Sequence, residues 1–123
     1  MEDLTIANEQ ITASSVVNSS SSASNGRLHF PGGELVFGSW TSEFNNSNQW
    51  LQVDFHEITY IAEILSQGRQ DNDEWVKSYF VSSSDDGVNF YYHNSSWYSE
   101  VCAKGLTSSE IFLLKFCDII NTK

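Results

Sequence analysis

The sequence predicts one all-β domain with the architecture of a sandwich or barrel. Its apolar residues fall in short runs, and one of these, Trp50 to Phe55, alternates apolar and polar residues as a half-buried strand does. Turn-forming clusters such as Pro31-Gly32-Gly33 separate the runs. The 123 residues, of which 40% are hydrophobic, suffice for a single core. Several short strands joined by turns are typical of these all-β architectures.

The first half of the chain contains three predicted strands. Ile11 to Ala13 is expected to be a short strand, followed by Asn18 to Asn25, a loop of serine, alanine and asparagine that we expect to be too polar to pack. Trp50 to Phe55 is the clearest strand. Ile58 to Leu65 is rich in β-branched and aliphatic residues and predicts a buried strand. It ends at Ser66-Gln67-Gly68-Arg69, where the glycine permits a sharp turn.

The second half predicts at least two more strands. Trp75 to Ser83 is expected to be a strand that ends at Asp85-Asp86-Gly87, a hairpin signal leading into a strand over Val88 to Tyr92. Ser109 to Ile120 is a denser apolar stretch. It fits either a final strand or a short helix, and its pattern does not decide between them.

The charge balance excludes some partners. The chain has 6 Lys and Arg against 16 Asp and Glu, a formal net charge of -10. This charge repels nucleic acid and anionic lipid surfaces at long range. It is compatible with neutral sugars, basic protein patches or divalent cations, and it also serves solubility.

Several features concern the compartment of the protein. No run is long enough to span a membrane, and the acidic start, Met1-Glu2-Asp3-Leu4, is unlike a secretory signal. N-glycosylation sequons occur at Asn18, Asn45 and Asn94, although some such triplets arise by chance in a chain rich in Ser and Asn. Cys102 and Cys117 could form one disulfide or remain two free thiols.

A series of short motifs across residues 10 to 90 resembles the discoidin family, also called the coagulation factor 5/8 type C family, in order and spacing. The motifs are Ile11-Thr12-Ala13-Ser14-Ser15, Gly26-Arg27-Leu28, Gly38-Ser39-Trp40-Thr41, Asn48 to Phe55, Ser66-Gln67-Gly68-Arg69, Trp75 to Tyr79 and Ser83 to Phe90. We interpret residues 1–123 as a single discoidin-like domain whose match is clearest over 10–92, with a divergent tail over 93–123.

The chain departs from the family pattern at several places. The family's first cysteine is absent, and Phe80 and Ser83 stand where a lysine and an aromatic residue are usual. The closing strands expected after Tyr92 are missing, although Leu114 to Ile119 faintly resembles the family's ending. The tail could therefore be a shortened last strand or an unrelated sequence. A jelly roll without its closing strands would expose a sheet edge, so we expect reduced stability, self-association or completion by a partner.

The resemblance implies a distorted jelly-roll β-sandwich or barrel, galactose-binding-domain-like and incomplete at its C-terminus. It implies a non-catalytic adhesion module, extracellular or at the cell surface, whose loops at one end bind phospholipid head groups, glycans, collagen or other proteins. These loops map to Val16–Asn25, Pro31–Asn48 and Arg69–Glu74, which we call the first, second and third loops. The first loop lacks a positive charge and an aromatic or aliphatic tip, so membrane insertion is disfavoured.

The third loop is the predicted ligand site. It combines a guanidinium group, carboxylates and amides with a neighbouring aromatic ring, which suits sugar hydroxyls and the face of a sugar ring. The candidate residues are Arg69, Asp71, Asn72, Asp73, Glu74 and Trp75, with Asn45 from the second loop. Alternatively, the loop is a solvated turn in which Arg69 pairs with Asp71 or Asp73 at the surface.

The same loop could also hold a metal ion. Asp71 and Asp73 could supply oxygen ligands to a structural Ca²⁺, although no cofactor is required for the predicted function.

The predicted function is lectin-like glycan binding through the loops at one end of the barrel. One alternative is a module that binds protein, such as collagen or a receptor, using Arg69 and Glu74 as charged anchors. Another is a truncated isoform with little binding of its own. We expect no enzymatic activity, because nucleophile-elbow, zinc-protease and phosphate-loop motifs are all missing from the sequence.

Overall fold

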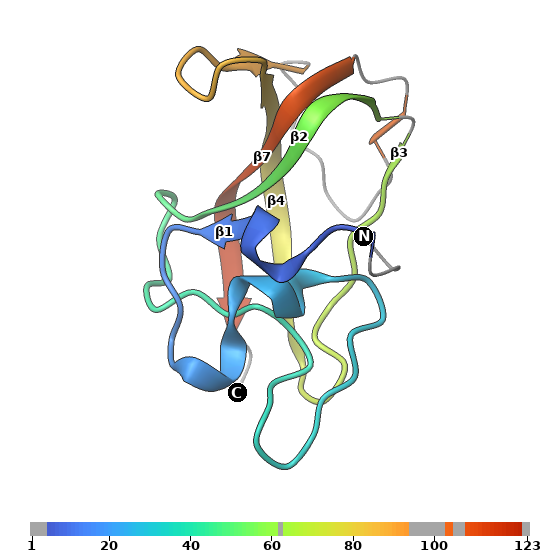
Figure 1. The fold of residues 1–123 in the computed structure, drawn as a ribbon. Helices are drawn as coiled ribbons and strands as arrows, with labels where there is room; N and C mark the ends of the chain where they lie inside the picture. The colour runs from blue at the N-terminus through green and yellow to red at the C-terminus, as the bar shows by residue number, and fades with distance from the viewer. Residues whose placement is uncertain (1–4, 62, 94–102, 105–107, 122–123) are drawn as a thin grey trace.

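A computed structural model describes residues 5–61, 63–93, 103–104 and 108–121, with side chains described for 5–61 and 64–93. Five strands form one antiparallel sheet in the order β1-β2-β7-β4-β5, and two short strands, β3 and β6, pair separately (Figure 1). The strands are β1 Ile11–Ala13, β2 Trp50–Tyr60, β3 Glu63–Ile64, β4 Glu74–Ser84, β5 Tyr91–Tyr92, β6 Ala103–Lys104 and β7 Ser108–Asn121.

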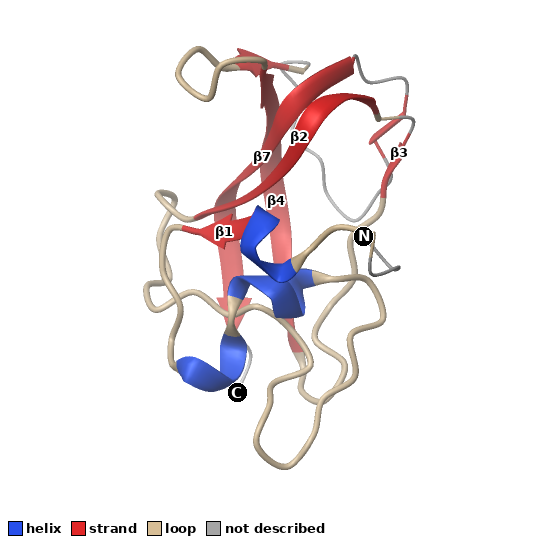
Figure 2. Cartoon of the chain, in the orientation of Figure 1, coloured by secondary structure: helices blue, strands red, loops and turns tan. Residues whose placement is uncertain are grey.

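Helical structure in the described residues is limited to three short 3-10 turns, so the all-β prediction is confirmed (Figure 2). The turns are η1 Asn8–Gln10, η2 Ser19–Ser21 and η3 Ala23–Gly26. Within the described part of the chain, no helix has the length and hydropathy that crossing a membrane requires.

The core lies on one face of the large sheet. Its buried side chains come from β1, β2 and β4: Ile11, Leu51, Val53, Tyr79 and Val81. Leu51 of β2 and Val81 of β4 both pair with Leu114 of β7, so they project from the same face of the sheet. Burial of each such aliphatic side chain contributes about 1.5–3 kcal/mol.

The apolar stretch near the C-terminus is the strand β7, which decides between the two predicted alternatives. β7 lies between β2 and β4 and pairs with both of them (Figure 1). It pairs with β4 from Glu74 to Ser84, with irregularities on both sides of Ser78, and with β2 from Trp50 to Tyr60, with one irregularity. The tail therefore satisfies the backbone groups on the facing edges of β2 and β4.

The prediction of a separate buried strand over Ile58 to Leu65 is wrong. Ile58 and Tyr60 belong to the end of β2 and are 68% and 67% exposed, and Leu65 is 56% exposed. The pairing of β2 with β7 is irregular between Asp54 and Thr59, where His56 has a φ of 60°. β-branched residues indicate an extended backbone, but burial depends on where the strand leaves the core.

The predicted strand over Val88 to Tyr92 is reduced to β5. The Asp86 carboxylate accepts hydrogen bonds from the backbone amides of Val88 and Asn89, each at 2.8 Å, and from the Ser84 hydroxyl at 2.9 Å. These bonds hold the pKa of Asp86 well below its usual range. The predicted turn is therefore present but longer than a two-residue hairpin, because Asp86 organises the residues on both sides of Gly87.

The loops gather at two ends of the sheet. The first, second and third loops come together at the lower end in Figure 1, and the turn between β4 and β5 lies at the upper end. The predicted ligand site therefore lies at the end of the domain opposite to Asp86.

Candidate functional site

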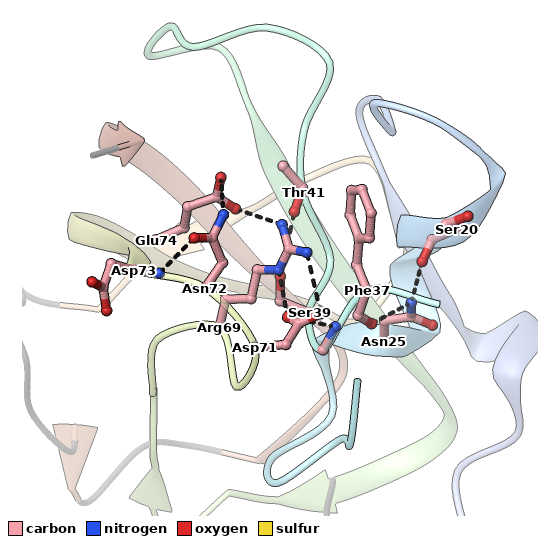
Figure 3. A network of polar contacts seen from close by, with 11 residues as sticks. Ser20, Asn25, Phe37, Ser39, Thr41, Arg69, Asp71, Asn72, Asp73 and Glu74 are labelled. Carbon is pink, nitrogen blue, oxygen red and sulfur yellow. Dashed lines mark hydrogen bonds and ion pairs between the residues drawn. The ribbon is translucent and has the colours of Figure 1, made fainter. Parts of the chain in front are cut away.

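Arg69 is the centre of a compact polar cluster at the loop end (Figure 3). Its Nε and Nη2 atoms donate to Oδ1 and Oδ2 of Asp71 at 2.5 and 3.2 Å, and its Nη1 atom donates to Oε2 of Glu74 at 2.9 Å. The ring of Phe37 lies under the guanidinium group, with 4.0 Å between Cζ and the ring centroid. We call these four residues the Arg69 cluster. The pairing of Arg69 with Asp71 that the alternative interpretation expects is present, with the Arg69 side chain 11% exposed and the Asp71 side chain 32% exposed.

The backbone of the third loop turns tightly to bring these groups together. The amide of Arg69 donates to the carbonyl oxygen of Glu74 at 2.8 Å, which closes the loop at the start of β4. Inside the turn, the amide of Glu74 donates to the carbonyl oxygen of Asn72 at 2.9 Å. The Asn72 side-chain amide also donates to Oε1 of Glu74 at 3.2 Å. The loop is thus fixed by its own polar groups.

Asp71 connects the third loop to the second. Its Oδ1 atom accepts a hydrogen bond from the amide of Gly38 at 3.1 Å. A Cβ atom at Gly32 would lie 2.7 Å from the Asp71 carboxyl carbon, and one at Gly38 would lie 2.9 Å from Oδ1. The two glycines therefore provide the space that the carboxylate needs.

Phe37 joins the first loop to the other two. Its amide donates to the carbonyl oxygen of Ser20 at 2.7 Å, and its carbonyl oxygen accepts from the Asn25 side chain at 3.1 Å (Figure 3). Its ring meanwhile lies against Arg69. The three loops thus form one connected surface.

The ion pair between Arg69 and Asp71 persists over a wide pH range. Hydrogen bonding by Arg69 is the main cause that lowers the pKa of Asp71, and the Asp71 hydrogen bond is the main cause that raises the pKa of Arg69. Because the pKa of Asp71 is lower in the folded state, the stabilisation is present above the unfolded value of about 3.9. It is lost only as the pH falls through the lowered folded value.

The predicted ligand residues divide into two groups. Arg69, Asp71, Asn72 and Glu74 contact one another, whereas Asp73 is exposed and Trp75 remains 39% exposed at the start of β4. Asn45 is exposed in the second loop and makes none of the contacts that build the Arg69 cluster.

The described residues contain no group of three or more His, Cys, Asp or Glu side chains that could hold a metal ion. The Asp71 carboxylate is directed at Arg69 and the Gly38 amide. Calcium is therefore not part of the function proposed below.

The sequence did not indicate a pocket between the first and second loops. It has a volume of about 550 Å³, and its walls include the side chains of Ser22, Ser24, Asn25 and Phe30. The expectation that Asn18 to Asn25 is too polar to pack is wrong, because Asn25 is only 4% exposed. Its Oδ1 atom accepts from Ser22 Oγ at 2.9 Å and its Nδ2 atom donates to the Phe37 carbonyl oxygen. Internal hydrogen bonds thus make burial of this polar loop possible.

Other predicted features lie near the loop end or outside the described residues. Asn18 is exposed, and its Oδ1 atom accepts from the amide of Ser20 at 2.9 Å. Asn94 and Cys102 lie outside the described residues, and the side chain of Cys117, in β7, is not described either.

Three aliphatic side chains are exposed at the loop end, two at the start of the first loop and one in the second loop. Val16 and Val17 are 39% and 44% exposed, and Leu35 in the second loop is 83% exposed.

The sheet and its connected loops define a discoidin-type β domain, and the comparisons agree. The family model described as F5/8 type C domain matches residues 10–116. The chain therefore belongs to the F5/8 type C domain family.

Known relatives are longer proteins. Retinoschisin of Homo sapiens is 44% identical over 77 residues, which cover 61% of this chain and 33% of retinoschisin. Lactadherin of Bos taurus is 32% identical over 120 residues, 91% of this chain and 26% of lactadherin. Coagulation factor VIII of Canis lupus familiaris is 38% identical over 95 residues, 73% of this chain and 4% of that protein. The chain thus spans 33% or less of the length of these three relatives.

Two solved structures share the fold. Discoidin II of Dictyostelium discoideum superposes with a TM-score of 0.83 at 21% identity, covering 90% of this chain and 50% of discoidin II. The family 32 CBM from C. perfringens NanJ, solved in complex with galactose, superposes with a TM-score of 0.63 at 16% identity. That match covers 93% of this chain and 92% of the CBM. The predicted discoidin-like jelly-roll fold is therefore confirmed.

Proposed function

We propose that this chain is a non-catalytic extracellular module that binds a neutral glycan at its loop end. The observation that carries the proposal is the position of Trp75, which remains 39% exposed next to a loop that the Arg69 cluster holds in place. An exposed aromatic ring can stack on the apolar face of a sugar. The amide of Asn72 and the carboxylate of Asp73 can hydrogen-bond to sugar hydroxyls beside it.

A glycan fits this surface better than a protein anchored on Arg69 and Glu74. Arg69 donates a hydrogen bond of 2.9 Å to the Glu74 carboxylate, and the Asp71 carboxylate accepts two more hydrogen bonds from Arg69. Three of the five guanidinium N–H groups are therefore engaged within the chain. A protein ligand could pair with either residue through its full charged edge only by displacing a partner within the cluster, whereas a sugar on Trp75 would leave the cluster intact.

Two further observations support the proposal. The family 32 CBM that shares the fold was solved in complex with galactose, so the fold can carry a sugar site. The sequons at the exposed Asn18 and Asn45 support an extracellular location.

Galactose titration of the purified chain, followed by NMR of the tryptophan indole groups, tests the proposal. Trp75→Ala is expected to weaken binding about tenfold or more, which corresponds to about 1.4 kcal/mol. Tyr91→Ala is the matched control, because Tyr91 is 68% exposed in β5, away from the loop end. A glycan array then identifies the preferred sugar. A folded protein that binds no neutral sugar on the array would exclude the proposal.

A further inference from the structure

The groups around the Asp71 carboxylate are arranged like a binding site for the carboxylate of a ligand. Arg69 holds it with a two-pronged contact, from Nε at 2.5 Å and from Nη2 at 3.2 Å. The amide of Gly38 adds a third donor at 3.1 Å. A planar guanidinium fork with a backbone amide is a common arrangement for binding a carboxylate from outside.

The surroundings of the carboxylate complete such a site. Gly32 and Gly38 leave room on one side, where Cβ atoms would approach Asp71 to 2.7 and 2.9 Å. Phe37 covers the guanidinium group, and Glu74 binds its remaining edge through Nη1. The chain supplies both the site and its occupant.

The charges at the cluster then determine what can approach it. The single guanidinium faces two carboxylates, those of Asp71 and Glu74, so the cluster carries a formal charge of −1, and the exposed Asp73 adds to it. An approaching anion meets this negative charge and finds the Arg69 fork already filled. An uncharged sugar meets neither obstacle.

We infer that Asp71 is the specificity-determining residue of the loop end: it fills an anion-binding site formed by Arg69 and the Gly38 amide, so that the surface accepts uncharged sugars and excludes those with a carboxylate. The consequence for sugars rests on the proposed function. The existence of the internally filled anion site does not depend on it.

Chemical rescue with acetate tests the anion site without any sugar. In Asp71→Ala the Arg69 fork and the Gly38 amide lose their occupant, and acetate is expected to replace it. At about 100 mM acetate the melting temperature should rise by a few degrees relative to 100 mM NaCl, because a ligand of the native state stabilises it by mass action. The Gly38 amide resonance should shift in the same titration.

Matched variants make the acetate result specific. Asp73→Ala removes an acid from the same loop without opening the site, so acetate should not affect it. Asp71→Asn keeps the space filled, so acetate should not change its melting temperature either. Asp71→Ser provides the same vacancy if Asp71→Ala does not unfold cooperatively. The inference would be overturned if Asp71→Ala and Asp71→Ser fold but have the same melting temperature in acetate and in NaCl.

Galactose and galacturonate form a matched pair of probes for the specificity itself. The wild-type chain is expected to bind galactose at least about tenfold more tightly than galacturonate, and Asp71→Ala should reduce or reverse that preference. Equal binding of the two probes by the wild type would contradict the specificity role. If the wild type binds neither probe nor any neutral sugar on the array while acetate still rescues Asp71→Ala, the proposed function fails and the anion site stands.

Discussion

At the scale of single residues, the loop end depends on two positions that lack a side chain. Gly32 and Gly38 both lie against the Asp71 carboxyl group. Gly32 does not have a positive φ, since Gly87 is the only glycine with one among the described residues. Space, and not backbone conformation, is therefore the reason that glycine suits position 32.

Gly32→Ala is expected to destabilise the fold by about 1–3 kcal/mol, because its Cβ atom would lie 2.7 Å from the Asp71 carboxyl group. Since the cost arises from Asp71, the same substitution should become nearly neutral in an Asp71→Gly background. A double-mutant cycle by urea unfolding measures this coupling. Gly33→Ala is the control, because nothing lies within 4 Å of the Cβ position at Gly33. Equal costs of Gly32→Ala in both backgrounds would contradict the steric explanation.

Some of the residue-scale picture could be predicted from the sequence. The pairing of Arg69 with Asp71 joins residues two positions apart, and it was one of the alternatives for this loop. The contacts of Phe37 and Gly38 with the third loop could not be predicted. Gly38 lies 33 residues before Asp71, and only the folded chain brings them together.

At the scale of elements, β7 shows why hydrophobic periodicity did not decide between a strand and a helix for Ser109 to Ile120. This strand is paired along both edges, by β2 and by β4. The stretch is a dense apolar run without clear alternation, and in such a run periodicity alone does not separate a strand from a buried helix segment. Trp50 to Phe55 alternated clearly and was predicted correctly. The first loop was misjudged because internal hydrogen bonds, which composition does not report, allow Asn25 to be buried.

Leu113→Pro is expected to abolish cooperative unfolding, because β7 has a neighbour on each side at this position, Gln52 and Ser82. Proline has no amide hydrogen, so it removes a ladder hydrogen bond from a central strand and leaves a carbonyl group without its donor, at a cost of about 1–3 kcal/mol for that group alone. Circular dichroism melts provide the measurement. Leu113→Ala removes most of the side chain but keeps the amide, so it serves as the control. A cooperative melt of Leu113→Pro close to that of Leu113→Ala would show that β7 is not essential to the sheet.

At the scale of the whole molecule, charge and exposed apolar surface favour opposite behaviour toward membranes. The chain carries a net charge of -10, whereas Leu35 is 83% exposed and Val17 is 44% exposed at the loop end. Insertion of one leucine contributes about 1.5–3 kcal/mol, which is less than the roughly 4.1 kcal/mol of a complex with a Kd of about 1 mM. Repulsion from an anionic surface acts over a Debye length of about 8 Å at physiological salt. Val16 and Val17 are already more than half buried, so Leu35 would supply most of the gain. We therefore expect insertion of these residues to be too weak to hold so acidic a domain on anionic lipid.

The chain is accordingly expected not to cosediment with vesicles of phosphatidylcholine containing about one fifth phosphatidylserine at 0.15 M salt. Vesicles of phosphatidylcholine alone separate the two effects, since they offer the apolar interior without the surface charge. Leu35→Asp should behave like the wild type in both, because the side chain is not expected to be inserted. Binding that increases with the phosphatidylserine content and is lost in Leu35→Asp would contradict the prediction. In that case the second loop would act as a lipid anchor, and the net charge of the whole chain would be a poor guide to the potential at its loop end.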